Sequence, residues 1–178
     1  MYDLTHLKPP RARTKNKTRN PQSPCFITGI VVIISRMTEF NFSIPIQVRY
    51  GDLDPQWHVN NARFLTYLEQ SRFAYITELG LWNGKSFLDL GLIVANMNIA
   101  FLAPIEYNMD VRVYARISRL GNKSMIFEHE IRDIHSEAIL GRAETVMVYY
   151  DYHTLSSQPI PDAWREKIST FEGIPPRS

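Results

Sequence analysis

Residues 60–80, NNARFLTYLEQSRFAYITELG, decide the fold that we predict for this chain. The stretch contains no proline and no internal glycine, so a helix can run through it uninterrupted. Asn60 is a suitable N-cap, and Gly80 is a suitable residue just past the C-terminal end. The side chains spaced for one buried face are Phe64, Leu65, Leu68, Tyr75 and Leu79. Further apolar residues around the helix predict that other structure wraps it on more than one side.

The segments around this helix have the pattern of β-strands. Before it, residues 44–50 alternate apolar and polar side chains, which is typical of a half-buried strand. After it, strand character returns in four segments, residues 92–103, 110–120, 123–134 and 138–152. The order of one strand, one long helix and four antiparallel strands predicts an α+β fold, with a five-stranded antiparallel sheet packed against the helix.

Charge divides the chain into two parts. Residues 1–36 contain seven basic residues and one acidic residue, whereas residues 37–178 contain 13 basic and 17 acidic residues. The folded part therefore lacks the basic surface that nucleic-acid binding requires. We expect residues 1–37 to be a disordered N-terminal extension, residues 38–155 to be the folded domain, and residues 156–178 to be a C-terminal tail with a short helix over residues 161–171.

Cysteine content and hydropathy exclude several further classes. Cys25 is the only cysteine, which excludes a disulfide framework, a thiolate zinc site and a cysteine nucleophile in the folded part. The longest apolar run, residues 25–34, is well short of the roughly 18 residues that span a bilayer. A basic stretch precedes this run, but no small-residue cleavage pattern follows it. We expect a cytoplasmic protein without an integral membrane segment.

The densest polar cluster is the loop GDLDPQWHVNN over residues 51–61. Two carboxylates, an imidazole and two amides lie next to the start of the predicted helix. Free backbone N–H groups and the helix dipole favour negative charge there, so the loop has the groups to polarise a carbonyl and act on it with a base. The same residue types also form turns and caps, so these observations leave a catalytic loop and a capping loop as alternatives.

Three motifs at fixed spacing carry a resemblance to a known family. VRYGDLD at residues 48–54, HVNN at residues 58–61 and YLEQSR at residues 67–72 resemble the hotdog-fold acyl-CoA thioesterases of the 4-hydroxybenzoyl-CoA thioesterase type, over about residues 42–153. The resemblance implies a hotdog domain, in which the sheet wraps round the central helix. It also implies hydrolysis of an acyl-CoA thioester to a free acid and coenzyme A, with no metal and no other cofactor.

The resemblance also implies roles for individual residues of the loop. Asp54 matches the catalytic carboxylate, acting as nucleophile or general base. Asn61 matches the residue whose backbone N–H polarises the thioester carbonyl. His58 and Asn60 match polar positions that line or shape the site. Trp57 stands where relatives often have glycine, so we expect its ring to narrow the acyl pocket.

Two other carboxylates compete with Asp54. Glu69 lies two turns beyond Asn61 on the same face of the helix, and a different branch of these thioesterases uses a helix glutamate. Arg72 follows Glu69 by three positions and can pair with it. Asp52 is predicted to fix the loop by accepting hydrogen bonds from neighbouring N–H groups.

A turn late in the chain is the predicted contact for coenzyme A. Its polar residues are Arg119, Asn122, Lys123 and Ser124. The pattern fits a solvated hairpin. In the resembled family, basic residues at this turn meet the coenzyme A phosphates, a task suited to cationic side chains.

Two other functions on the same fold remain open, and so does the assembly. Residues 51–58, GDLDPQWH, approach the Gly-Asp-x-Asn-Pro-x-His pattern of acyl-thioester hydratases and dehydratases, but with Asp for Asn and one extra residue before His. A non-catalytic acyl-CoA binding module is the other alternative. Consecutive apolar residues at 92–94 and 146–149 predict that a second chain covers part of the sheet, giving a homodimer or homotetramer.

Overall fold

The structure is a computed structural model that describes residues 40–176. The predicted N-terminal extension over residues 1–37 lies outside the described residues. The elements, in chain order, are β1 (Phe42–Gln47), the 3-10 helix η1 (Tyr50–Asp52), α1 (Asn61–Glu78), α2 (Phe87–Leu90), β2 (Leu92–Phe101), β3 (Asp110–Leu120), β4 (Ser124–Asp133), β5 (Ile139–Asp151), β6 (Ser156–Ser157) and α3 (Asp162–Glu172). The sequence did not predict the three short elements η1, α2 and β6, and the strand predicted over residues 44–50 ends at Gln47 because η1 begins at Tyr50.

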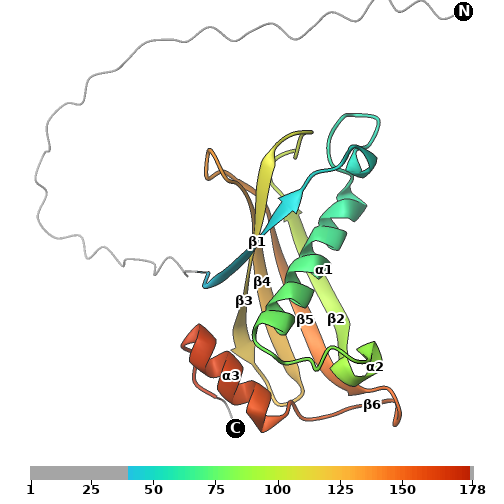
Figure 1. Cartoon of the computed structure of the whole chain (residues 1–178), viewed down its shortest axis with the longest axis vertical. Helices are drawn as coiled ribbons and strands as arrows, with labels where there is room; N and C mark the ends of the chain where they lie inside the picture. The colour runs from blue at the N-terminus through green and yellow to red at the C-terminus, as the bar shows by residue number, and fades with distance from the viewer. Residues whose placement is uncertain (1–39, 177–178) are drawn as a thin grey trace, which may run out of the picture. The chain divides into compact units, whose positions relative to one another are not determined.

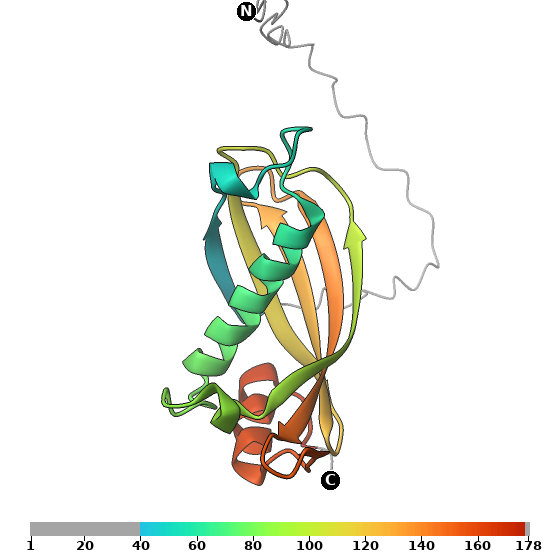
Figure 2. The same ribbon diagram turned by 90° about the vertical axis from the view of Figure 1, so that its right-hand side faces the viewer.

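The strands form one antiparallel sheet that curls round α1. Its order is β1-β3-β4-β5-β2, and the short β6 pairs with the end of β5. Figure 1 shows α1 lying across the sheet, and Figure 2 shows the strands bending around it. The predicted α+β hotdog fold, with one long helix inside a curled antiparallel sheet, is confirmed.

The ends of α1 follow from single residues. The side chain of Asn60 accepts a hydrogen bond of 2.9 Å from the backbone N–H of Ala62, as expected for an N-cap. Gly80 has a φ of 58° just past the C-terminal end, a conformation that glycine adopts without strain. The predicted helix is therefore confirmed, and so are its N-cap and the glycine that follows its C-terminal end.

The predicted inclusion of Leu65 in the buried face of α1 is wrong. Leu65 is 43% exposed, whereas the neighbouring side chains of Phe64 and Leu68 are buried. The buried row continues through Ser71 and Tyr75, with steps of three and four residues. Leu65 is one position beyond Phe64, which rotates its side chain by about 100° away from that row.

The core beneath α1 consists of two apolar clusters. The cluster towards the loop of residues 50–60 includes Val59, Phe64, Leu68, Val113, Ile131 and Leu140. The cluster towards α3 includes Tyr75, Ile76, Ile117, Met125, Phe127 and Ile168. Along α1, β4 and β5, the positions between the two clusters are buried but polar: Ser71, Arg72, His129 and Thr145. We call these four residues the polar layer.

The polar layer contains atoms that make no hydrogen bond within residues 40–176. They are Ser71 Oγ, Arg72 Nη1, Thr145 Oγ1 and both ring nitrogens of His129. Burial lowers the pKa of His129 to about 3, and the nearby positive charge of Arg72 contributes to the shift. The imidazole is therefore neutral at physiological pH.

Helix α3 closes the end of the sheet far from the loop of residues 50–60 (Figure 1). Ile168 is fully buried in the second cluster. The hydroxyl of Tyr75 donates to Glu172 Oε1, which also accepts the N–H of Ile117 at 3.0 Å. The bounds of α3 agree within one residue with the helix predicted over residues 161–171.

Two kinds of feature are absent from the described part of the chain. No helix within residues 40–176 combines the length and the apolar character needed to cross a membrane. Over the same residues, no group of three or more His, Cys, Asp and Glu side chains is placed to hold a metal ion.

Candidate active site

The loop between β1 and α1 is a tight hairpin. The N–H of Asp54 donates to the carbonyl of His58 at 2.8 Å, and the N–H of Trp57 donates to the carbonyl of Asp54 at 3.0 Å. Leu53 and Val59 form an antiparallel bridge just outside them. The three residues 55–57 therefore make the turn, and Asp54 and His58 face each other across it.

Trp57 occupies the position of this turn that usually requires glycine. In three-residue hairpins the last turn residue adopts a left-handed conformation, and Trp57 has a φ of 64°. For a residue with a side chain this conformation costs roughly 1–2 kcal/mol. The turn thus gives a physical reason for a glycine at this position, and it identifies Trp57 as a strained residue.

The hairpin brings the three predicted catalytic residues to one hollow. Directly opposed residues of an antiparallel pair project from the same face, which applies to Asp54 and His58. They line a hollow of about 290 Å³, together with Gln56, Val59, Asn61, Phe64 and residues 101–104. We call this the first hollow. Its walls come from the hairpin, the start of α1 and the end of β2.

The carboxylate of Asp54 is only partly engaged. Its Oδ1 accepts the N–H of Gln56 at 2.8 Å, which fixes the side chain against the turn. Its Oδ2 has no hydrogen bond or ion pair with any residue between 40 and 176. One carboxylate oxygen is therefore available to a reacting atom or to a water molecule.

The first turn of α1 also has a free donor. Asn60 accepts the N–H of Ala62 with its side chain and the N–H of Arg63 with its carbonyl, at 2.9 and 2.7 Å. The N–H of Asn61 has no acceptor among the described residues. The side chain of Asn60 is thus a cap and does not line the first hollow, while Asn61 presents a backbone donor at the positive end of the helix dipole.

Asp52 anchors the hairpin to α1, in agreement with its predicted role as an acceptor. The residue is buried, and its Oδ2 accepts hydrogen bonds from the hydroxyl of Tyr67 at 2.9 Å and from the N–H of Arg49 at 3.0 Å. Arg63 Nε lies 3.6 Å from Oδ1. The backbone carbonyl of Asp52 also accepts the N–H of Asn60 at 2.8 Å.

Tyr67 and Arg63 are site residues that the sequence analysis missed. Burial and the adjacent carboxylate of Asp52 raise the pKa of Tyr67, so its hydroxyl stays protonated as a donor. A signal for this contact exists in the sequence. Helical side chains point towards the N-terminus, so a tyrosine two turns into α1 can reach back to the preceding loop.

The competing carboxylate, Glu69, lies outside the first hollow. It is exposed on α1, and eight residues separate it from Asn61, or about 12 Å along the helix axis. Glu69 and its predicted partner Arg72 do not form an ion pair within 4 Å. Arg72 instead belongs to the polar layer, where burial lowers its pKa while the charge of Glu69 opposes that shift.

The predicted phosphate-binding turn lies at the other end of the sheet (Figure 1). β3 connects the two ends, and its eleven residues span roughly 30 Å. Lys123 Nζ donates to the carbonyl of Ser157 at 2.7 Å. The other three predicted residues line a separate hollow of about 410 Å³, whose walls include Arg119, Gly121, Asn122, Ser124, Ile126 and Val146. The structure therefore does not bring this turn to Asp54 within one chain.

Asp54 borders a second hollow on the other side of the hairpin. This hollow measures about 380 Å³ and is lined by Tyr50, Gly51, Leu53, Asp54, Pro55 and Trp57. Tyr50 and Trp57 are 71% and 65% exposed, and their rings have centroids 6.4 Å apart and planes at 65°. We call this the second hollow. The ring of Trp57 lines it and does not line the first hollow.

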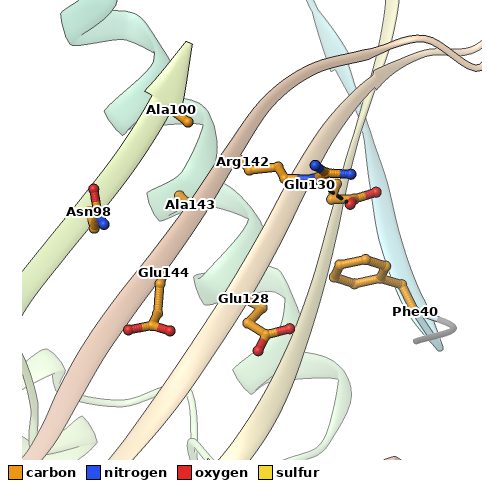
Figure 3. A pocket seen from close by; sticks show the side chains of 8 residues that line it. All are labelled: Phe40, Asn98, Ala100, Glu128, Glu130, Arg142, Ala143 and Glu144. Carbon is orange, nitrogen blue, oxygen red and sulfur yellow. Dashed lines mark hydrogen bonds and ion pairs between the residues drawn. The ribbon is translucent and has the colours of Figure 1, made fainter. Parts of the chain in front are cut away.

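A hollow on the outer face of the sheet is unrelated to this loop. It measures about 440 Å³ and is lined by charged side chains of β4 and β5 (Figure 3). Arg142 Nε donates to Glu130 Oε1 at 2.9 Å there. None of its lining residues belongs to the hairpin or to α1, so it provides no route to Asp54.

Comparisons with known proteins agree with this geometry. The profile of the thioesterase-like superfamily matches residues 48–168. The chain is 29% identical to the long-chain acyl-CoA thioesterase FadM of Escherichia coli over 128 residues, which cover 69% of this chain and 93% of FadM. A thioesterase of Thermus thermophilus, solved with coenzyme A and zinc, is 32% identical, with a TM-score of 0.67 over 76% of this chain and 98% of its own.

A further solved structure supports the fold alone. The 1,4-dihydroxy-2-naphthoyl-CoA thioesterase Slr0204 of Synechocystis is 22% identical, with a TM-score of 0.65 over 71% of this chain and 94% of its own. The profile match covers more than half of the chain and includes the hairpin, α1 and β2–β5. This chain therefore belongs to the thioesterase-like superfamily.

Proposed function

We propose that this chain hydrolyses an acyl-CoA thioester to a free acid and coenzyme A, with Asp54 as the reacting carboxylate. The observation that carries the proposal is the hairpin, which places the carboxylate of Asp54, the imidazole of His58 and the free N–H of Asn61 around one hollow. FadM is named a long-chain acyl-CoA thioesterase, and the Thermus thermophilus thioesterase was solved with coenzyme A. Both support this substrate class.

The chemistry follows from where charge develops. As the thioester carbonyl is attacked, its oxygen becomes negative, and the N–H of Asn61 at the positive end of α1 stabilises it. In one route Asp54 attacks the carbonyl carbon, the C–S bond breaks, and water then splits the resulting anhydride. In the other route Asp54 takes a proton from water, the new hydroxide attacks, and the leaving thiolate receives that proton.

Oxygen-18 label found in Asp54 would identify the anhydride route. In a single turnover in labelled water, hydrolysis of an anhydride at the carboxylate carbon leaves the label in Asp54. Direct attack by water places the label only in the product acid. Mass spectrometry of the peptide that contains Asp54 provides the measurement.

We further propose that the chain belongs to the 4-hydroxybenzoyl-CoA thioesterase type, in which a loop carboxylate reacts instead of a helix glutamate. The support is the position of Glu69, which is exposed and outside the first hollow. In this interpretation Glu69 contributes to the surface charge of α1 and takes no part in turnover.

The separation of the two ends of the sheet supports a proposal about assembly. Arg119 and Lys123 lie at the far end of β3 from Asp54, so a coenzyme A bound at Asp54 does not meet them in the same chain. Among residues 40–176, β1 and β2 are edge strands, each paired on one side only, so the other side can pair with another chain. We propose that a second copy supplies the turn, in a homodimer or a homotetramer built from such dimers.

A panel of acyl-CoA thioesters, read with a thiol reagent, tests the proposed function. Release of thiol with at least one member is the expected result. Hydration of crotonyl-CoA without thiol release would instead assign the chain to the hydratases. Tight binding with neither reaction would assign it to the non-catalytic binding modules.

A further inference from the structure

We propose that the second hollow binds the aliphatic chain of the acyl group, and that Tyr50 and Trp57 form its walls. The inference rests on the proposed function, because it takes Asp54 as the point at which the thioester carbonyl sits. It adds a substrate class and two specificity-determining residues to that function.

The first step is the position of Asp54 between two hollows. Asp54 lines both the first and the second hollow. A thioester carbonyl carries two substituents, the acyl chain and the sulfur of the carrier, which leave the reacting carbon in different directions. Each hollow begins at Asp54, so each can accept one of them.

The second step is the chemistry of the two linings. The pantetheine arm contains two amides, which need hydrogen-bond partners when they leave water. The first hollow offers polar side chains at Gln56, His58 and Asn61. Hydrocarbon surface of Tyr50, Leu53, Pro55 and Trp57 dominates the second hollow, where Asp54 is the one charged residue of the described lining. The acyl chain therefore belongs in the second hollow and the pantetheine arm in the first.

The adenine ring is not a candidate for the second hollow. A pair of exposed aromatic rings is a common platform for a nucleobase. In coenzyme A, however, the whole pantetheine arm and the diphosphate separate the adenine from the sulfur. A group in contact with Asp54 must be bonded closely to the reacting carbon, which the acyl chain is.

The third step is the geometry of the two rings. The planes of Tyr50 and Trp57 meet at 65°, so they form an open corner. A flat aryl group can stack on only one of the two ring planes at a time and meets the other ring at its edge. A flexible chain of methylene groups can follow both ring surfaces round the corner. The corner therefore offers more contact area to an aliphatic acyl group.

The fourth step is the strain at Trp57. Its φ of 64° would suit glycine, and the residue is 65% exposed, so within the chain it gains little burial in exchange. Strained residues cluster at ligand-binding sites, where contact with the ligand offsets the cost. Contact between the ring and an acyl chain supplies that missing burial.

The test compares Trp57→Gly and Tyr50→Ala with a matched control, Leu155→Gly. Leu155 is also a left-handed, exposed apolar residue, with a φ of 50° and 72% exposure, and it lies at the turn before β6. We measure kcat/KM for butanoyl-CoA and dodecanoyl-CoA. Each methylene that loses its apolar contact lowers kcat/KM about fourfold. The two site variants should therefore lose at least about tenfold with dodecanoyl-CoA and little with butanoyl-CoA, and the control should match the wild type.

Two results would overturn the proposal. An equal loss with both substrates would mean that the rings only hold the hairpin in place. No loss with either substrate would mean that the pair does not contact the acyl chain.

A binding measurement keeps this inference separate from the proposed reaction. S-dodecyl-coenzyme A is a thioether that cannot be hydrolysed, so its binding does not depend on the role of Asp54. It should quench tryptophan fluorescence in the wild type and bind at least about tenfold more weakly to Trp57→Gly, whereas S-butyl-coenzyme A should bind both equally. If turnover is absent but this length dependence is present, the proposed reaction fails and the acyl site stands. If turnover is present and the length dependence is absent, the acyl site fails.

Discussion

The hydroxyl of Tyr67 donates a hydrogen bond of 2.9 Å to Oδ2 of Asp52, and so joins α1 to the loop that precedes it. The backbone carbonyl of Asp52 holds the N–H of Asn60, next to the free N–H of Asn61. Two residues farther along the hairpin is the carboxylate of Asp54. The bond from Tyr67 thus helps to fix how the carboxylate of Asp54 and the N–H of Asn61 lie relative to each other.

Removal of this bond should reduce turnover without removing any group that touches substrate. Tyr67→Phe leaves the buried carboxylate of Asp52 without one donor, which should lower the free energy of unfolding by about 1–3 kcal/mol. We expect kcat to fall by about tenfold, because the hairpin and the helix start lose their fixed relation. Tyr107→Phe, at an exposed tyrosine, is the matched control. Unchanged kcat in Tyr67→Phe would show that the other contacts of Asp52 suffice.

Asp54→Asn should lower turnover by at least about 10²-fold, the low end for the loss of a general base. The fold should survive, because the amide oxygen of Asn can still accept the N–H of Gln56. Circular dichroism checks the fold and thiol release checks the rate. Glu69→Gln is the comparison, and we expect it to retain wild-type activity. The opposite pattern would transfer the reaction to the helix glutamate.

His129 predicts a loss of stability in acid. Its pKa is about 3 in the folded chain, below the ordinary value of 6.5, so below pH 6.5 the unfolded chain binds a proton that the folded chain does not. The free energy of unfolding therefore keeps its full value above pH 6.5. As the pH falls from 6.5 towards 3, it decreases by about 1.4 kcal/mol per pH unit. Urea unfolding at pH 7.5 and pH 5 measures it.

The matched variants for this prediction are His129→Phe and His135→Asn. Between pH 7.5 and pH 5, the free energy of unfolding should fall by about 2 kcal/mol less in His129→Phe than in the wild type. His135 is exposed at the turn between β4 and β5, and its replacement should leave the contribution of His129 in place. An unchanged pH dependence in His129→Phe would show that another group is responsible.

Arg119→Ala and Lys123→Ala should raise KM for acyl-CoA more than they lower kcat. Phosphate contacts are the same in the bound substrate and in the transition state, so they contribute to binding without changing the chemical step. The effect should shrink with pantetheine thioesters, which lack the nucleotide. Lys167→Ala removes a cation whose Nζ bonds the carbonyl of Gly80, and it serves as the control. Equal effects on both substrates would exclude a phosphate role for the turn.

Activity should depend on assembly. Sedimentation at micromolar concentration should give at least twice the mass of one chain, and dilution to monomer should reduce the specific activity in parallel. The physical reason is the distance between the turn at residues 119–124 and Asp54, which no single chain closes. A stable monomer with full activity would contradict this prediction.

Local pattern was sufficient to predict the long helix, the five main strands and the α+β class, but not the short elements, and the hotdog fold itself was implied by the family resemblance. The spacing of apolar residues located α1 and the strands, and β3 has the predicted bounds, residues 110–120. Leu65 was wrongly assigned to the core because periodicity alone does not separate adjacent positions at the margin of a broad apolar face. Only the packed structure shows which of Phe64 and Leu65 faces the sheet.

The site was predictable in part. The motif located Asp54, His58 and Asn61, but the hairpin that makes them neighbours depends on hydrogen bonds between backbone groups, which residue types do not specify. The second hollow depends on the left-handed conformation of Trp57, whose side chain gives no hint of it. The polar layer joins residues as distant in sequence as Ser71 and Thr145, so it becomes visible only when the strands are in register.

The polar layer also bears on how this chain can change over evolutionary time. It interrupts the apolar contacts between the half of the core that supports the hairpin and the half that holds α3. Cooperativity between parts of a protein follows from continuous packing, so an interruption lets the two halves respond to substitution more independently. We therefore expect substitutions in the hairpin half and in the α3 half to add in their effects on the free energy of unfolding, so the hairpin half can change with little effect on the packing of the α3 half.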